Sequence, residues 1–213
     1  MYFIFDNLTA SIVGGIVLMM LFGIQSRIQS NTVESTIMYA AKNQTLQFAE
    51  LLERDLSNAG YLSTPGDQGI LRHATHNSSG DITTDTLEFW GSDGTGLRTR
   101  VRYVLDKTKT ATIDGEPVQL YQVNRYENNM LGWKNAGASL PTLTEFRIDL
   151  LDSANNGVVD IADARKIRVR FEAAVVGGRL KDTGGNTEST FLRTLRWGVT
   201  LSPKGLALQS YQG

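Results

Sequence analysis

One segment of twelve residues, 152–163, has the oxygen donors and the spacing of a calcium-binding loop. Gly157 stands where such a loop turns sharply. However, Ala154 replaces the expected acid at the third position, and an Asp ends the loop in place of the usual bidentate Glu. Because Asp, Asn and Gly also populate turns for backbone reasons, we prefer a turn between two strands and keep calcium as the alternative. The ligands in that alternative are Asp152, Asn156, the Val158 carbonyl, Asp160 and Asp163.

Six basic residues alternate with apolar ones in two segments that are predicted to be strands. If those strands are neighbours, the six side chains form a basic stripe suited to DNA or to an acidic filament partner. A solvated sheet face, with acidic partners such as Glu88 and Glu172, explains the same pattern, and we prefer it. Nucleic acid therefore has no independent support as a partner. The six residues are Arg98, Arg100, Arg102, Lys166, Arg168 and Arg170.

The composition and the motifs argue against an enzyme. The 213 residues include no cysteine, which excludes disulfides, thiolate zinc sites and cysteine nucleophiles. The two histidines, His73 and His76, have no acidic or thiolate cluster beside them, so we expect ordinary loop residues. The chain has no Gly-x-Ser-x-Gly, P-loop or HExxH motif. We expect a non-enzymatic protein that requires no cofactor.

The N-terminal segment has a composition that suits lipid. Residues 7–26 contain no ionisable side chain, and roughly 20 helical residues cross a hydrocarbon core about 30 Å thick. The flanks carry polar side chains such as Asn7 and Gln25, and Gly14 and Gly15 lie near the centre. We interpret this segment as able to lie in lipid and also against protein.

The same helix is expected to continue far beyond the apolar segment. Residues 25–58 contain no Pro or Gly, and apolar residues recur at helical period from Val33 and Ile37 to Leu56. Charged residues 50 and 53–55 are placed on the opposite side, and Gly60 can end the helix in a left-handed conformation. We predict one helix from about residue 7 to about residue 59, about 80 Å long.

Beyond Gly60 the pattern changes to that of an antiparallel sheet. Residues 62–84 are rich in Ser, Thr, Gly, Asn and Asp, and predict a long connecting loop. Alternation of apolar and polar residues then predicts six strands. One sheet face is polar, and the apolar helix stripe is expected to cover the other, which gives an α+β fold. The strands are predicted within residues 86–90, 99–105, 120–126, 146–150, 167–173 and 191–201.

A long helix that is half membrane-like and half amphipathic, followed by an antiparallel sheet, resembles the architecture of type IV pilins and type II secretion pseudopilins. Residues 48–61, FAELLERDLSNAGY, resemble the end of the helix in W-type minor pilins and J-type minor pseudopilins. Further segments fall in the order of that family, so the resemblance spans nearly the whole chain. These segments are residues 85–89, 101–105, 120–125, 146–150, 167–171 and 199–206.

The resemblance implies a pilin-like fold that assembles through its N-terminal helix. If Met1 were removed, Asp6 would be an acid in fifth place, where pilins carry a Glu that pairs with the N-terminal ammonium of a neighbour. A simple helix-capping role for Asp6 is the alternative. The residues implied in assembly are Asp6, Ile12, Ile16, Leu18 and Leu21.

The resemblance also implies partners and a location. The partners are copies of the chain, other pilin-like subunits, assembly machinery and the cytoplasmic membrane. Residues 1–59 would be the helix, with 7–26 as its membrane or filament-core half and 27–59 as its amphipathic half; residues 60–213 would be the β domain. The subunit would cross the inner membrane once before assembly and then enter an extracellular or periplasmic filament. A membrane-tethered sensor, binding or adhesin domain that never polymerises is the alternative function.

Overall fold

The computed structural model describes residues 2–63, 67–78, 81–92, 95–113, 116–129, 132–178 and 189–207. Within these ranges, the backbone alone is described at 2–6, 78, 81, 112–113, 116, 129, 176–178 and 189–192. The chain forms two compact units, Met1–Ala40 and Ala41–Gly213. The units therefore divide within the helix near residue 40, rather than at the end of the helix.

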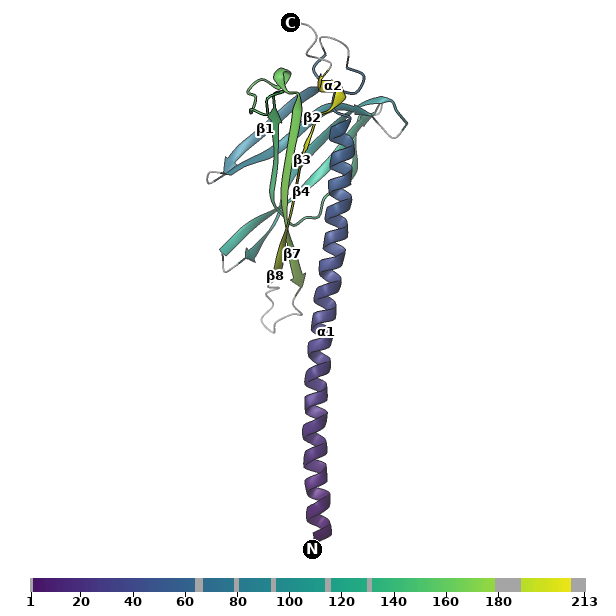
Figure 1. The fold of residues 1–213 in the computed structure, drawn as a ribbon, viewed down its shortest axis with the longest axis vertical. Helices are drawn as coiled ribbons and strands as arrows, with labels where there is room; N and C mark the ends of the chain where they lie inside the picture. Colours follow the sequence, from purple (N-terminus) through teal and green to yellow (C-terminus); the bar gives the residue numbers. More distant parts are fainter. Residues whose placement is uncertain are drawn as a thin grey trace. The chain divides into compact units, whose positions relative to one another are not determined.

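The predicted N-terminal helix is confirmed. Helix α1 runs without interruption over Tyr2–Ser57 (Figure 1). After it, Asn58 and Ala59 form a turn, and Gly60 has a φ of 76° in the left-handed region. The N–H of Gly60 donates to the carbonyl of Trp90 at 2.7 Å, so the end of the helix is tied to the sheet.

The second unit contains an eight-stranded antiparallel sheet, so the predicted α+β class is confirmed. The strand order is β1-β2-β3-β4-β6-β7-β8, and β5 pairs with β4. The short helix η1 follows β6, and the short helix α2 (Lys204–Ala207) follows β8. The bounds are β1 Ile70–Ser78, β2 Asp81–Ser92, β3 Arg98–Ile113, β4 Glu116–Asn129, β5 Gly132–Ala138, β6 Leu143–Leu151, η1 Ile161–Asp163, β7 Lys166–Gly178 and β8 Ser189–Leu201.

The prediction of a long loop over residues 62–84 is wrong, because this segment contains β1 and the start of β2. Strand β1 pairs with β2 alone and buries only Ile70 among its apolar residues. Strand β5, which was not predicted, contains Gly132 and Gly137 and is mostly exposed. A strand at the edge of a sheet has little apolar surface to bury, so the alternating pattern that marks a central strand is weak in both.

The core of the second unit lies between the C-terminal part of α1 and one face of the sheet. Leu52 and Leu56 of the helix are fully buried, in one cluster with Phe89 and Val169 of the sheet. The rings of Phe48 and Phe171 meet edge to face at 5.4 Å. Each fully buried Leu contributes about 1.5–3 kcal/mol to the stability of the fold. The burial of Leu52 and Leu56 therefore helps to hold this part of the helix against the sheet.

Candidate functional site

The principal candidate site is the apolar surface of helix α1. Twelve large apolar side chains between Leu8 and Ile28, the apolar segment of α1, are between 48% and 77% exposed. The helix is long and apolar enough to cross a membrane, and none of its most apolar window is buried. Contiguous apolar surface of this kind marks a site that meets lipid or protein. The residues are Leu8, Ile12, Val13, Ile16, Val17, Leu18, Met19, Met20, Leu21, Phe22, Ile24 and Ile28.

The structure places the predicted assembly residues Ile12, Ile16, Leu18 and Leu21 on this exposed surface. The backbone of Asp6 belongs to α1, but its side chain lies outside the described residues. The predicted pairing of Asp6 therefore stays a prediction.

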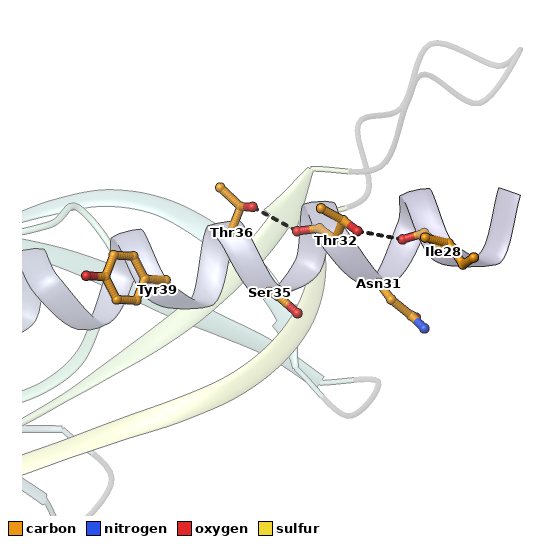
Figure 2. A pocket seen from close by; sticks show the side chains of 6 residues that line it. All are labelled: Ile28, Asn31, Thr32, Ser35, Thr36 and Tyr39. Carbon is orange, nitrogen blue, oxygen red and sulfur yellow. Dashed lines mark hydrogen bonds between the residues drawn. The ribbon is translucent and has the colours of Figure 1, made fainter. Parts of the chain in front are cut away.

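Polar side chains follow the apolar segment along the same helix. Figure 2 shows a shallow groove there, lined by residues including Asn31, Ser35 and Tyr39. The hydroxyls of Thr32 and Thr36 each donate to the carbonyl four residues earlier, at 2.8 Å. Such bonds satisfy a hydroxyl within its own helix, so Thr32 and Thr36 need no hydrogen-bond partner from another element.

A buried ionic cluster fixes the end of the helix to the sheet. Asp55 is 5% exposed, so the prediction that it lies on the solvated side of the helix is wrong. Its carboxylate accepts from the Tyr103 hydroxyl at 2.8 Å and pairs with Arg125, which is 3% exposed. Arg125 also contacts Glu127 at 2.6 Å. Burial, and then the charge of Asp55, raise the pKa of Tyr103 well above its ordinary value, so the phenol remains a donor.

The C-terminal segment closes over the same end of the helix. Leu206 of α2 is buried in the main core cluster. Beside it, the backbone of Gly205 lies directly against the carbonyls of Ala59 and Gly60. A Cβ on Gly205 would overlap the Gly60 carbonyl and lie 2.7 Å from the Ala59 oxygen. Only glycine allows this close approach of two backbones.

The six basic residues do not form one stripe. Arg98, Arg100 and Arg102 lie on β3, whereas the other three lie on β7, and β4 and β6 come between these strands. On β3, Arg100 and Arg102 both bind Glu88, which is 3% exposed; the Arg102 Nε donates to it at 2.8 Å. Two of the three β3 arginines therefore pair with Glu88 as predicted, whereas Arg98 pairs with Asp67, and Glu172 pairs with Arg196 of β8.

Two of the β3 arginines, Arg98 and Arg102, also lie against tryptophan rings. The Arg98 guanidinium lies 4.2 Å from the centre of the Trp90 ring, and that of Arg102 lies 3.9 Å from the centre of the Trp133 ring. Cation–π contacts of this kind contribute about 0.5–1 kcal/mol at exposed sites. One face of the Trp90 ring and one face of the Trp133 ring are therefore covered by arginine.

In the candidate calcium loop, two of the five predicted ligands, Asp152 and Asp160, accept hydrogen bonds from the protein. Asp152 accepts from the side-chain amide of Asn156 at 3.0 Å and from its backbone N–H at 2.8 Å, and these two hydrogen bonds lower the pKa of Asp152. Asp160 caps helix η1 by accepting from Ala162 N. The ammonium of Lys166 binds the Ser153 carbonyl at 2.8 Å.

Two further predicted ligands of this loop lie beside Asp152 and Asp160. Val158 and Asp163 line an open depression with Asp152 and Asp160. In the described part of the chain, no three His, Cys, Asp or Glu side chains come together as metal ligands would.

The two histidines lie on strand β1, so the expectation that they are loop residues is wrong, and they have separate partners. His76 contacts Asp85 at 2.5 Å, whereas His73 Nε2 lies 2.9 Å from the Ile148 carbonyl. Because that carbonyl can only accept, Nε2 of His73 carries the proton. Their separate partners argue against a shared metal or catalytic role.

Because of His73, the fold is expected to lose stability in acid. Burial lowers its pKa, against the opposing effects of the Ile148 carbonyl and Asp149. Because the folded-state pKa lies below the unfolded value of about 6.5, this contribution is present above that pH and is lost as the pH falls below it. We expect the free energy of unfolding to drop less in His73→Gln than in the wild type between about pH 7.5 and pH 5.5. Urea unfolding followed by tryptophan fluorescence measures this difference, and equal drops in both proteins would contradict the prediction.

Compared with known proteins, the chain matches no family profile, no curated protein and no solved structure.

Proposed function

We propose that this chain is a pilin-like structural subunit, without catalytic activity, that assembles into a filament through helix α1. The filament would be an extracellular type IV pilus or a periplasm-spanning pseudopilus of the type II secretion kind. The observation that carries the proposal is the exposed apolar segment of α1, which continues into the buried stripe of the second unit. The same helix thus carries an apolar surface that lipid or protein must cover and, nearer its C-terminal end, a stripe that the β domain buries.

The apolar segment suits two environments in turn. Before assembly it would lie in the cytoplasmic membrane, where it satisfies its own backbone hydrogen bonds as a helix. After assembly it would pack among like helices, and small residues such as Gly14 and Gly15 allow helices to approach closely. Each environment covers the same side chains, so leaving lipid for protein exposes no apolar surface to water.

The partners in this proposal are copies of the chain, other pilin-like subunits and the machinery that extracts them from the membrane. The proposal requires no cofactor. The 152–163 loop would serve as a structural turn, because two of its predicted ligands, Asp152 and Asp160, already accept from backbone N–H groups. The arginines of β3 would stabilise the sheet rather than bind nucleic acid, because Glu88 occupies two of them.

Assembly is expected to fail when a charge is placed in the apolar segment. Leu18→Asp or Leu21→Asp puts a carboxylate in the centre of the helix, which costs about 2.5–3.5 kcal/mol in lipid. We expect the amount of protein in the fraction sheared from cells to fall by at least roughly tenfold, which corresponds to about 1.4 kcal/mol. Immunoblotting of the sheared and membrane fractions measures this loss.

The matched control is Leu97→Asp, which makes the same chemical change at a side chain of the β domain that is 68% exposed. This variant should be sheared from cells as efficiently as the wild type. If the wild type itself never enters the sheared fraction and always remains with membranes, the filament proposal fails and the tethered domain takes its place.

A further inference from the structure

Two isolated charges lie just beyond the apolar segment of α1. Between Asn7 and Ala41, the sequence has charged side chains only at Arg27 and Glu34. Both are exposed. Among the described residues, neither has a hydrogen bond or an ion pair. Their opposite signs make each a fitting partner for the other.

Their spacing prevents them from pairing within one helix. Side chains three or four residues apart are neighbours on a helix, but seven residues advance it by about 10.5 Å. Seven residues are also close to two full turns, so the two side chains lie on nearly the same face, about 20° apart. Arg27 of one helix therefore comes level with Glu34 of a second, parallel helix that is displaced by seven residues.

We propose that Arg27 pairs with Glu34 of a second copy of this chain, and that the two helices pack in parallel with an axial offset of seven residues. The inference rests on the proposed function, because it requires the α1 helices of two copies to pack together. It adds the register of packing and the two residues that set it.

A second pair of residues fits the same offset on the same face. Ile16 and Gly23 are also seven residues apart, and Ile16 precedes Arg27 by eleven residues, or about three turns. Ile16 is exposed, and no atom lies within 4 Å of the place where a Cβ on Gly23 would stand. The offset that joins the two charges thus brings a bulky side chain level with an open notch. Small residues allow close approach of this kind in apolar helix packing.

The offset also separates the assembled state from the waiting state. Copies inserted in one membrane lie parallel and at one depth, so Arg27 stands beside Arg27 and like charges repel. A displacement of about 10.5 Å along the axis replaces this repulsion with an ion pair. The ion pair therefore stabilises copies that are added stepwise along the axis, and it does not form between copies at the same depth in the membrane.

Engineered cysteines test this register, because the native chain has none. Sheared filaments of full-length chain carrying Arg27→Cys and Glu34→Cys are treated with a mild thiol oxidant and analysed on a non-reducing gel. We expect disulfide-linked dimers and larger multimers. Arg27→Cys alone should give none, because level copies are required to link identical positions. Arg27→Cys with Ser35→Cys is the matched control, because residue 35 lies on another face of the helix and should give none.

The outcomes separate this inference from the proposed function. If the wild type is absent from the sheared fraction, the proposed function fails. If the double-cysteine protein is sheared from cells but does not cross-link, the offset is wrong and the filament proposal stands. Cross-links from Arg27→Cys alone would show level packing and also overturn the offset. Products that stop at dimers would show antiparallel pairs in place of a staggered array.

If the double-cysteine variant does not assemble, charge reversal tests the pairing of Arg27 with Glu34 instead. Arg27→Glu and Glu34→Arg should each lower the amount of sheared protein by roughly tenfold, because like charges then meet. The variant with both reversals restores an opposite pair and should return to the wild-type amount. If the double reversal is as poor as the single ones, the two residues do not pair.

Discussion

Replacing Asp55 with alanine is expected to lower the free energy of unfolding by about 3 kcal/mol, because it leaves Arg125 buried without its main partner. Both side chains are 4% exposed, so water cannot take the place of the lost carboxylate. The hydroxyl of Tyr103 also loses its acceptor. Urea unfolding of the full chain in detergent measures the loss through tryptophan fluorescence. All three tryptophans lie in the β domain, at positions 90, 133 and 197.

Two comparisons establish the cause of that loss. Asp85→Ala removes a carboxylate that is 42% exposed and pairs with His76, and it should cost less than about 1 kcal/mol. Adding Arg125→Met to Asp55→Ala removes the unpaired charge and should recover part of the stability. Simple additivity of the two single losses would show that the pair is not coupled.

Replacing Gly205 with alanine is expected to destabilise the domain by about 3 kcal/mol, at the upper end for an overpacked site. The new methyl group would overlap the Gly60 carbonyl, and the opposing atoms are backbone rather than a flexible side chain. The turn must then move away from the helix and withdraw the buried Leu206 from the core. The same urea unfolding measurement detects this change as a lower midpoint.

Gly157→Ala is the control for Gly205→Ala, because no atom lies within 4 Å of the place where its Cβ would stand. It should change stability by no more than about 0.5 kcal/mol. Equal midpoints for Gly205→Ala and Gly157→Ala would show that α2 is not held against the end of the helix.

Much of the fold follows from local patterns. The uncharged segment 7–26 and the helical stripe to Leu56 predict α1, and alternation predicts the central strands. The edge strands β1 and β5 escape prediction because they bury few apolar side chains. The buried part of the helix stripe begins near Thr45, whereas Val33 is 58% exposed. Periodicity shows that a face is apolar, but it does not show how far along the helix a partner covers it.

The ionic cluster at the end of the helix shows what pattern reasoning misses and what signal was present. Asp55 follows Phe48, Leu51 and Leu52 by seven, four and three residues, so helical period places it on the apolar side of the helix, where a charge requires a buried partner. Arg125 gives the stronger signal, because it occupies the inward-facing position two residues after the buried Val123. A charge at a core-facing strand position requires a buried partner. No local pattern identifies that partner, because it lies 70 residues away in the sequence.

The candidate sites differ in how far the sequence defines them. An exposed apolar helix depends on composition alone, so residues 7–26 are identified directly. The basic residues depend on which strands are neighbours, and β4 and β6 separate the two groups. The 152–163 loop depends on where side-chain oxygens point, and those of Asp152 and Asp160 accept from N–H groups of the protein.

The central claim is that the apolar segment of α1 passes from lipid into a protein core. A single cysteine at Val17 tests it most directly in sheared, phospholipid-free filaments, with a single cysteine at Leu97 as the exposed reference. Val17 is 48% exposed in the isolated chain. The account predicts that a water-soluble maleimide labels Leu97→Cys rapidly and leaves Val17→Cys protected until the filaments are dissociated in detergent. Rapid labelling of Val17→Cys in intact filaments, or protection only where phospholipid remains bound, would contradict it.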